Sequence, residues 1–457
     1  MSEIKKIKPS LSKGTRDFLP SEVAKRNYIF DTIKSVFRKY GFEQIETPAI
    51  ERLETLTGKY GEEGDKLLFK ILNSGDYLKD APTEELSKGN SQSITKFIAE
   101  KGLRYDLTVP LARYVVQHQD DLAFPFKRFH IGQVWRGDKP QKGRYQEFYQ
   151  CDADVIGSNS LLNEVELLFI YTQSFEALKI SNYELRINNR KILSGLSELI
   201  NEKDRFSDII IAIDKLDKIG LDKVTEELSQ KGLSEENLNI LKSFLSIGGS
   251  NEEILTSLKN LFSSNDSGKK GIQELEFILK QCAPGNLTPV IDTTLARGLD
   301  YYTGLIVEVK PTEIQMGSIG GGGRYENLTE VFGGQNMSGV GISFGIERIY
   351  DVMEELNLFP ETISQGVKVL FVPREKSVEE FTFHQVQKLR DSGIAAEIFL
   401  GNVKKQKQFS YVEQKKIPFL IEVGSNEMTT GLFRVRNTLT RETGADMTLQ
   451  EVLCFLQ

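Results

Sequence analysis

Two strand-like segments joined by a short basic loop, within residues 126–157, constrain the fold of this chain most strongly. "FKRFHIGQVWRG" and "RYQEFYQCDADVIG" have the composition of β-strands, and "GDKPQKG" between them has the glycine, proline and polar residues of a turn. Parallel strands need a crossover of about a dozen residues or more, so this short connection joins antiparallel neighbours. The pattern predicts a hairpin in a mostly antiparallel sheet and argues against a Rossmann domain.

The chain up to about residue 360 divides into three parts. Residues 21–40 and 161–178 have helical periodicity, whereas short charged helical segments separated by Gly, Ser and Asn begin near residue 190. Strand patterns resume in "TPVIDTTLA", "GLIVEVK" and "SGVGISFG". We therefore expect one α+β domain in two parts, residues 1–188 and 286–360, interrupted by a helical insertion domain at residues 189–285.

The last part of the chain, residues 366–457, alternates between strand and helix patterns after the linker-like "LFPETISQG". Strands "VKVLFVP", "AAEIFL" and "PFLIEV" with helices between them are typical of a small α/β domain with a largely parallel sheet. This part carries 13 Lys/Arg and 11 Asp/Glu, a balance of +2, so the remainder must carry −9 to give the overall −7. Local basic surfaces on such an acidic chain can still bind nucleic acid.

The sequence offers few residues for metal binding or disulfide formation. Its three cysteines and three histidines lie far apart, with no pair at a metal-ligand spacing. No apolar run approaches the roughly 20 residues of a membrane span, and "MSEIKKIKPS" lacks the apolar core of a signal peptide. We expect a cytoplasmic protein with no membrane segment, no disulfide and no protein-bound metal.

The hairpin loop and its flanks carry concentrated positive charge. Residues 127–144 contain six Lys/Arg and one acidic residue, which a solvent-exposed hairpin tip could also have. Arg136, however, follows an apolar strand directly, where its planar guanidinium suits bidentate binding of a phosphate. Lys139 and Gln141 lie in the loop and can reach outward to a polyanion.

Polar side chains on two neighbouring segments form a second candidate group. Phe148, Gln150 and Asp154 alternate along the return strand and can project from one face. In "YDLTVPLARY" we expect Asp106 and Thr108 to share a strand face, where a carboxylate and a hydroxyl can hold a primary ammonium. A polar pair at a strand edge is the alternative interpretation.

The stretch "LARGLDYYTGLIVEV", residues 295–309, places a permanent cation and two phenols at the start of a strand pattern. Spacing alone favours a surface turn in which Arg297 pairs with Asp300. The alternative is a binding site in which Arg297 faces an anion beside Tyr301 and Tyr302. The stretch by itself leaves both alternatives open.

Two later segments leave similar alternatives. "GGGGRYENL", from residue 320, is either a flexible turn or a backbone that approaches a ligand closely, and it lacks the acidic residue of a dinucleotide fingerprint. In "GVGISFGIERIYDVM", Glu347 and Arg348 fall in the first turn of a predicted helix. They are either a surface ion pair or, for Arg348, part of a phosphate site at the helix start.

The order of these motifs resembles the class II aminoacyl-tRNA synthetases and, within them, the histidyl-tRNA synthetases. "KGTRDFLP" is similar to the opening of that family, "VWRGDKPQKGRYQEFYQCDADVIG" to motif 2 and "GVGISFGIERI" to motif 3. "LARGLDYYTG" and "GGGGRYENL" resemble the two histidine-specific signatures. Motif 1 is matched only loosely, but the resemblance extends over essentially the whole chain.

This resemblance implies a fold and a reaction. The fold would be an α+β catalytic domain with an antiparallel six-stranded sheet, a helical insertion and a C-terminal α/β anticodon-binding domain at residues 366–457, assembled as a homodimer. In the reaction, L-histidine and ATP would form histidyl-adenylate and pyrophosphate, and histidine would then pass to the 3′ end of histidine tRNA. Mg²⁺ would accompany the ATP phosphates.

The resemblance also assigns roles around ATP by motif position. Arg136 would bind the α-phosphate and the histidine carboxylate. Arg297 would lie on the other side of the α-phosphate, where other class members use a metal ion, and Arg348 would bind the γ-phosphate. Phe148 would stack on adenine, and Asp138 would accept a hydrogen bond from the adenine amino group.

For histidine, the resemblance implies a pocket that satisfies both imidazole nitrogens, through Asp154 and Tyr302. The implied ammonium ligands are Asp106, Thr108 and Gln150. The full predicted histidine-binding set is Asp106, Thr108, Arg136, Gln150, Asp154, Arg297, Tyr301 and Tyr302. In the hairpin loop, the implied contacts to the tRNA acceptor end are Lys139 and Gln141.

Asp138 and Asp154 depart from the family pattern, because many bacterial members have glutamate at these positions. Aspartate keeps the charge but shortens the side chain by a methylene group. Two other functions remain as alternatives: the synthetase-like regulatory subunit of ATP phosphoribosyltransferase, which lacks aminoacylation activity, and a non-catalytic RNA-binding protein. The three arginines implied around ATP, the α/β tail and the paired histidine signatures favour the synthetase.

Overall fold

The computed structural model describes all residues except 1–7, 58–60, 142, 297–301, 327–328, 335, 361–362, 364–365 and 402–404. The chain forms two compact units. The larger unit comprises Arg26–Leu358 with the N-terminal segment up to Asp17, and the smaller comprises Phe359–Gln457 with Phe18–Lys25. Each unit has a β-sheet of its own.

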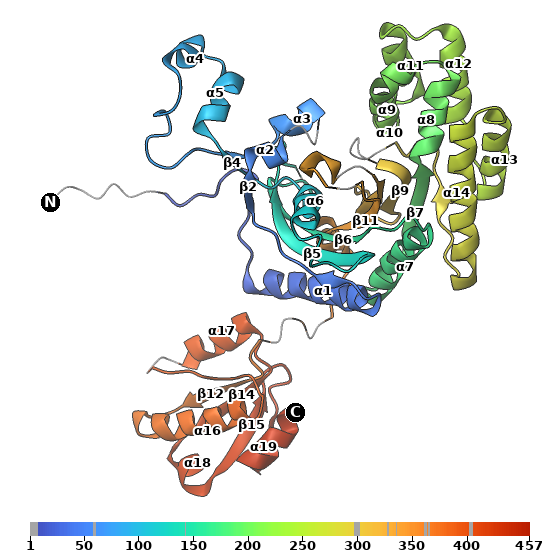
Figure 1. Ribbon diagram of the computed structural model, residues 1–457. Coiled ribbons are helices and arrows are strands. Elements are labelled where there is room, and N and C mark those ends of the chain that lie inside the picture. The colour runs from blue at the N-terminus through green and yellow to red at the C-terminus, as the bar shows by residue number, and fades with distance from the viewer. Residues whose placement is uncertain are drawn as a thin grey trace. The chain divides into compact units, whose positions relative to one another are not determined.

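An eight-stranded sheet forms the centre of the larger unit (Figure 1). Its order is β1-β5-β6-β11-β10-β9-β7-β8. Along the sheet from β5 through β6, β11, β10 and β9 to β7, adjacent strands pair antiparallel. The short edge strands β1 and β8 pair in parallel with β5 and β7. The bounds are β1 Glu43–Gln44, β5 Phe126–Trp135, β6 Glu147–Ile156, β7 Tyr183–Asn189, β8 Val290–Ile291, β9 Tyr302–Pro311, β10 Gly320–Tyr325 and β11 Gly339–Gly345. The predicted hairpin is β5–β6, and the mostly antiparallel α+β fold is confirmed.

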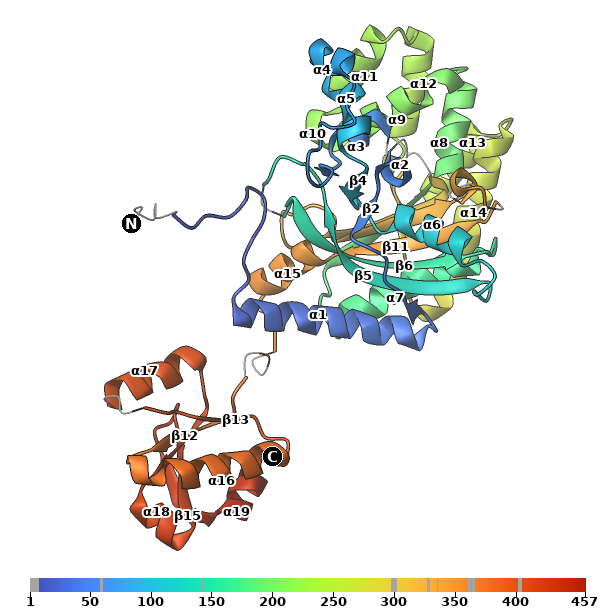
Figure 2. The ribbon, with the colours of Figure 1, turned by 60° about the vertical axis from the view of Figure 1, so that its left-hand side comes forward.

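Two helices, α1 (Pro20–Lys39) and α7 (Leu162–Ala177), cover one face of this sheet (Figures 1 and 2). The ring of Phe37 on α1 lies 5.2 Å from that of Phe129 on β5 and 5.8 Å from that of Phe344 on β11. All three rings are buried. This apolar layer fixes the orientation of the strands and leaves the polar side chains of the opposite face to form a site.

A small sheet and short helices lie between β1 and β5 along the chain. The sheet order is β2-β4-β3, and its strands pair antiparallel. The bounds are β2 Ile50–Arg52, α2 Leu53–Leu56, α3 Gly61–Lys66, β3 Lys70–Ile71, α4 Thr83–Lys88, α5 Ser91–Ile98, β4 Lys101–Leu103 and α6 Thr108–Gln117.

The predicted strand containing Asp106 and Thr108 is wrong, because Thr108 begins helix α6. Oδ1 of Asp106 accepts hydrogen bonds from the backbone N–H groups of Thr108 and Val109, at 3.1 and 3.0 Å. A carboxylate that satisfies these first amides stabilises a helix start. Pro110 in the first turn is compatible with the helix, since its missing N–H would have no partner within the helix there.

A group of helices follows β7 and precedes β8, so that the chain leaves the sheet and returns to it in a neighbouring strand. Their bounds are α8 Arg190–Leu199, α9 Phe206–Asp214, α10 Leu216–Ile219, α11 Leu221–Gln230, α12 Glu235–Leu245, α13 Asn251–Leu261 and α14 Asp266–Cys282. They have an apolar interior of their own, in which the rings of Phe244 and Phe262 lie 6.2 Å apart. The exact domain boundaries at residues 189 and 285 stay a prediction.

The smaller unit contains a five-stranded sheet of order β13-β12-β14-β15-β16. The first three strands are parallel, as predicted, whereas β15 and β16 are antiparallel additions that the sequence did not predict. The bounds are β12 Val369–Pro373, α16 Glu379–Asp391, β13 Ala396–Ile398, α17 Lys405–Lys415, β14 Phe419–Val423, α18 Ser425–Thr430, β15 Leu432–Asn437, β16 Thr443–Thr448 and α19 Leu449–Leu456. The predicted α/β domain is confirmed.

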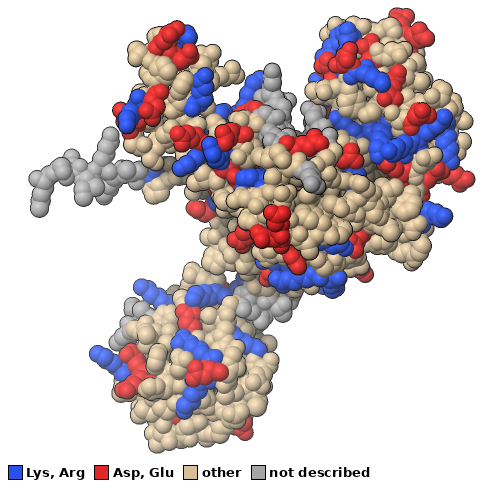
Figure 3. All heavy atoms as spheres, viewed as in Figure 1, with Lys and Arg blue, Asp and Glu red and all other residues tan. Residues whose placement is uncertain are grey.

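Charge on the smaller unit is mixed. Figure 3 shows Lys and Arg side chains interspersed with Asp and Glu on the viewed face of this unit. Several of these charges are paired at the surface, as in the Arg434–Asp446 contact at 2.7 Å. Among the helices that the structure describes in either unit, none is long and apolar enough to cross a membrane.

Candidate active site

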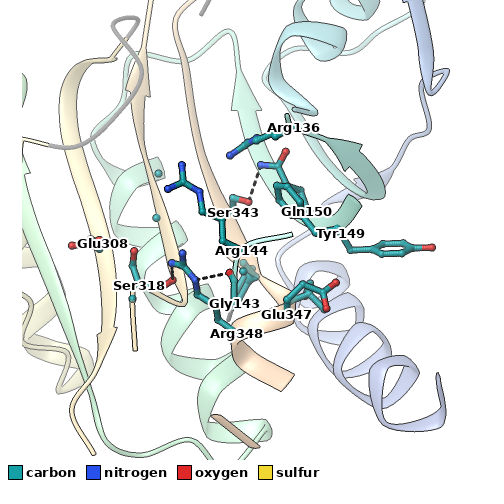
Figure 4. Close-up of a pocket in the computed structure, with 18 of the residues that line it drawn as sticks. Arg136, Gly143, Arg144, Tyr149, Gln150, Glu308, Ser318, Ser343, Glu347 and Arg348 are labelled. Carbon is teal, nitrogen blue, oxygen red and sulfur yellow. Dashed lines mark hydrogen bonds between the residues drawn. The ribbon is translucent and has the colours of Figure 1, made fainter. Parts of the chain in front are cut away.

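A cavity of about 610 Å³ lies against the sheet face opposite α1 and α7 (Figure 4). The β5–β6 hairpin, strands β9 to β11 and the start of α15 (Ile346–Glu355) line it. Helix α9 of the insertion contributes Asp214 to the lining. The site is therefore assembled from segments that lie far apart in the sequence.

Small residues in the middle of the sheet, Gly320 to Gly322 of β10 and Ser343 of β11, form a glycine-rich floor of the cavity. The glycine run forms strand β10 between β9 and β11, so the turn interpretation is wrong. A Cβ atom on Gly323 would lie 2.9 Å from Cδ1 of Tyr302, and one on Gly341 of β11 would lie 2.0 Å from Oδ1 of Asp154. Glycine is required at these positions because neighbouring side chains, and at Gly323 also the carbonyl oxygen of Leu305, occupy the space of a Cβ.

A buried ion pair fixes Asp154. Its Oδ2 lies 2.7 Å from Nη2 of Arg128, and its Oδ1 accepts a hydrogen bond from the Tyr325 hydroxyl at 2.7 Å. The side chains of Arg128 and Asp154 are 0% and 4% exposed. Burial raises the pKa of Asp154, and the Arg128 guanidinium opposes that rise. The carboxylate is thus held in one orientation, since rearrangement would leave a buried cation unpaired.

Two further titratable groups lie beside this pair. Burial raises the pKa of Asp152 to about 7, although Arg128 opposes the rise. Burial, together with the nearby cations Arg128 and Arg104, lowers the pKa of His130 to about 3. His130 is therefore neutral at pH 7, whereas Asp152 changes its protonation state close to pH 7.

Arg136 lies at the rim of the cavity. Its Nε donates to the carbonyl oxygen of Tyr105 at 3.1 Å. The guanidinium carbon lies 4.3 Å from the ring centroid of Tyr105 and 5.1 Å from that of Phe148. Two aromatic faces and a carbonyl therefore orient this cation toward the cavity (Figure 4).

Arg348 reaches the cavity from the first turn of α15. Its Nη1 donates to the carbonyl oxygen of Ser318 at 2.7 Å, and its Nε donates to that of Gly143 at 3.3 Å. These contacts join the hairpin loop to the segment before β10 (Figure 4). The cation lies at the start of a helix, where backbone N–H groups also favour anions.

The residue before it, Glu347, points away from Arg348 (Figure 4). Its Oε2 lies 2.6 Å from Nη1 of Arg26 on α1 and also pairs with Nη2 of Arg16. Glu347 is 6% exposed, so the interpretation of Glu347 and Arg348 as a surface ion pair is wrong. The carboxylate instead anchors the start of α15 to α1 and to the N-terminal segment.

The hairpin loop is closed by local contacts. Backbone hydrogen bonds of 3.0 and 2.9 Å join Gln141 and Arg144 across Gly143, whose φ is +72°. Nη2 of Arg144 donates to Oδ1 of Asp138 at 2.9 Å. Lys139 and Gln141 are exposed on this loop. These contacts tie the described loop residues to one another, and Asp138 is buried.

Comparison with known proteins shows the family of the chain. A family model described as Histidyl-tRNA synthetase matches residues 14–78 and 88–349, and one described as Anticodon binding domain matches residues 367–457. The chain belongs to the histidyl-tRNA synthetase family. The family predicted from the motifs is therefore confirmed.

Individual histidyl-tRNA synthetases resemble the chain over nearly its full length. The histidine–tRNA ligase of Phocaeicola vulgatus is 53% identical over 437 residues, 95% of this chain and 96% of that protein. The crystal structure of histidyl-tRNA synthetase from Nostoc sp. PCC 7120 has a TM-score of 0.81 at 31% identity and covers 99% of both chains. An ATP phosphoribosyltransferase regulatory subunit/histidyl-tRNA synthetase from Bacillus halodurans C has a TM-score of 0.73 at 19% identity, covering 92% of this chain and 100% of that one, and shares the fold.

The fold of the histidyl-tRNA synthetase family brings most of the predicted site residues together. The predicted residues that line the cavity are Arg136, Asp138, Gln141, Phe148, Gln150, Tyr302 and Arg348. Asp106 and Asp154 are buried close by, and each raises the pKa of Asp152 by its charge. Thr108 lies in the first turn of α6, and Lys139 extends from the loop. Arg297 and Tyr301 lie outside the described residues.

Sequence reasoning missed several polar residues of the site. Arg128, Asp152 and Ser343 all lie on the sheet face from which Gln150 projects, here named the ligand face, and Asp152 shares strand parity with Gln150 and Asp154. That parity was a readable signal for Asp152. The pairing of Arg128 with Asp154 was not readable, because alternation along β5 does not show which cation is buried.

Proposed function

We propose that the chain joins L-histidine to histidine tRNA through a histidyl-adenylate, with ATP as the energy source. Family membership and the names of relatives at 53% identity over 95% of the chain support this activity. They disfavour the regulatory-subunit alternative, and the α/β unit matched as an anticodon-binding domain adds to the case. The cavity with two arginines from separate motifs is the structural observation that carries the proposal, since a non-catalytic RNA-binding protein would not need it.

ATP would bind along the hairpin. Arg136 would hold the α-phosphate and the histidine carboxylate, and Arg348 would hold the γ-phosphate. Phe148 would stack on adenine once Arg136 turns to the phosphate, and Asp138 would accept from the adenine amino group. Support comes from the two guanidinium groups and the ring, which line one cavity. Arg297, by motif position, would complete the charge around the α-phosphate.

Histidine would bind deeper, over the glycine floor. Gln150 would hold its ammonium together with Asp106 and Thr108, although the latter two reach the site from the start of α6 and not from a strand. The imidazole would lie between Asp154 and Tyr302, with Tyr301 beside it by motif position. A pocket that pairs both imidazole nitrogens would reject side chains that leave its buried polar groups unpaired.

The reaction would need no covalent intermediate with the protein. The histidine carboxylate attacks the α-phosphorus in line and pyrophosphate leaves, so the chain contributes positioning and positive charge. Among the described residues, no cluster of three or more His, Cys, Asp or Glu could hold a metal ion. As the family resemblance implies, Mg²⁺ would enter with the ATP phosphates, where it would neutralise charge.

The tRNA would contact both units. Lys139 and Gln141, exposed on the hairpin loop, are proposed to meet the acceptor end, and residues 366–457 to bind the anticodon. We also propose the homodimer that the resemblance implies. Sedimentation of the purified chain checks the assembly, and a monomer at micromolar concentration would contradict it.

Histidine-dependent exchange of labelled pyrophosphate into ATP tests the central proposal. Purified chain is incubated with ATP, Mg²⁺, labelled pyrophosphate and either L-histidine or another amino acid. We expect exchange with L-histidine and not with the other amino acid. When tRNA is added, we expect transfer of histidine to the tRNA. Absence of histidine-dependent exchange would contradict the enzyme assignment, because both alternative functions lack this step.

A further inference from the structure

Asp152 is a buried carboxylate on the ligand face for which the proposed function has no role. It lies on β6 between Gln150 and Asp154, with Ser343 of β11 opposite it on one side and His130 of β5 on the other. It is 3% exposed. Its Oδ1 accepts no hydrogen bond from any described residue. A buried acceptor without a partner costs free energy, so its presence here calls for an explanation.

The hydrogen bonds around Ser343 have a defined direction. An ionised carboxylate can only accept, so the hydrogen bond that joins Asp152 to Ser343 is donated by the serine hydroxyl. The Ser343 oxygen in turn accepts from Nε2 of Gln150, at 3.5 Å (Figure 4). This leaves Oε1 of Gln150, a residue of the cavity lining, with no partner among the described residues.

We propose that Asp152 is a positioning residue for the substrate, which orients the Gln150 amide through Ser343 so that its oxygen accepts from the histidine ammonium. This inference rests on the proposed function. With Asp152 ionised, the chain of hydrogen bonds runs from Gln150 to Ser343 to Asp152. With Asp152 neutral, the Ser343 hydroxyl can donate to Gln150 instead. The amide then turns and presents its NH₂ group to the ammonium, which has no acceptor there.

The titration of Asp152 supports this arrangement. Burial raises its pKa to about 7, opposed by Arg128 and reinforced by the neighbouring carboxylates. The charged or titratable groups that interact with it are Arg104, Asp106, Arg128, Cys151, Asp154 and Tyr171. His130, opposite it on β5, has a pKa lowered to about 3 and stays neutral between pH 6 and 8. A bound ammonium favours ionised Asp152, so histidine binding weakens as pH falls below 7.

The experiment compares Asp152→Asn with the wild-type chain by pyrophosphate exchange at pH 6, 7 and 8. At pH 8 we expect KM for histidine to rise about tenfold in the variant, with kcat and KM for ATP within about twofold of wild type. At pH 6 the wild-type Asp152 is protonated as well, so the ratio of the two KM values approaches one. Titration of free histidine and of the other buried groups is common to both proteins and cancels in this ratio.

Two further variants separate positioning from structural damage. Ser343→Ala breaks the same series of hydrogen bonds and is expected to raise KM for histidine to a similar extent. The double variant is expected to raise this KM little further. Cys151→Ala is the matched control, since its side chain lies on the opposite face of β6, and it should leave both KM values unchanged. A ratio independent of pH, a parallel rise in KM for ATP or a silent Ser343→Ala variant would overturn the inference. Absence of exchange in wild type would instead overturn the proposed function.

Discussion

Gly341 shows how one missing side chain supports a buried charge pair. Oδ1 of Asp154 would lie 2.0 Å from a Cβ at this position, and Oδ2 holds the fully buried Arg128. Displacing the carboxylate would leave a guanidinium without its partner in a low-dielectric environment. The smallest residue is therefore required here by electrostatics as much as by packing.

Gly341→Ala is expected to lower the free energy of unfolding of the larger unit by about 2–4 kcal/mol, from overpacking and the weakened ion pair. Trp135, the single tryptophan, lies at the end of β5 in the larger unit, so denaturant unfolding followed by its fluorescence reports this unit. Gly248→Ala is the control, since its Cβ meets nothing within 4 Å. Equal unfolding free energies for the two variants would contradict this account.

At the scale of elements, the start of α15 serves two purposes through adjacent residues. Arg348 faces the cavity, whereas Glu347 anchors the helix to Arg26 of α1 and to Arg16. Arg26 is 5% exposed, so this carboxylate compensates a buried charge. A buried ion pair on the other side of the same helical turn thus sets the position of Arg348, which is proposed to bind phosphate.

Glu347→Ala is expected to lower the free energy of unfolding by about 3–5 kcal/mol, because it leaves Arg26 buried without its carboxylate. KM for ATP should rise as well, since the first turn of α15 is no longer anchored. Glu276→Ala removes the exposed partner of Lys259 and is the control, with an expected change below about 1 kcal/mol. A loss of stability with KM for ATP unchanged would separate the anchor from the phosphate site.

Elements with strong local signals were predictable, and those decided by distant contacts were not. The β5–β6 hairpin, α1 and α7 followed from turn residues and apolar periodicity. Strand β10 did not, because glycine has low strand propensity and the run becomes a strand only between β9 and β11. Asp106 was assigned to a strand because "Asp-x-Thr" suits alternation and a helix start equally well, and only the observed amide bonds decide.

For the candidate site, sequence patterns located the side chains but not their partners. Gln150 and Tyr302 were placed at the cavity by motif position, and both line it. The pairing of Asp138 with Arg144 and the burial of Arg128 depend on the three-dimensional path of the chain. Alternation in the sequence shows which side chains share a strand face. The pKa of such a side chain depends on the groups that the rest of the fold packs against that face.

At the scale of the whole molecule, the features behind the proposed function are divided between the two units. The cavity belongs entirely to the larger unit, and the anticodon-binding match belongs to the smaller. The smaller unit has its own apolar core, built on residues such as Phe371 and Phe433. Adenylate formation and tRNA selection are therefore expected to respond differently to truncation.

Deleting residues 366–457 should reduce tRNA charging by about a hundredfold or more, because one of two linked binding modules is lost. Histidine-dependent pyrophosphate exchange should stay within a fewfold of the full chain, since the larger unit retains its sheet and cavity. Both rates are measured on the same preparation, with Trp135 fluorescence as the check of folding. Equal losses in both rates would mean that the smaller unit is needed for folding.

The attachment of β8 links the helical insertion to the sheet in a further way. This two-residue strand pairs with β7 only through Val290 and Ile291. Asn251 of α13 binds it as well, donating from Nδ2 to the Pro289 carbonyl at 2.8 Å and accepting from the Ile291 N–H at 2.9 Å. If the chain between β7 and β8 were unstructured, bringing its two ends together would cost roughly 4 kcal/mol of chain entropy. The folded insertion already holds these ends together, so β8 and the insertion are expected to unfold as one cooperative unit.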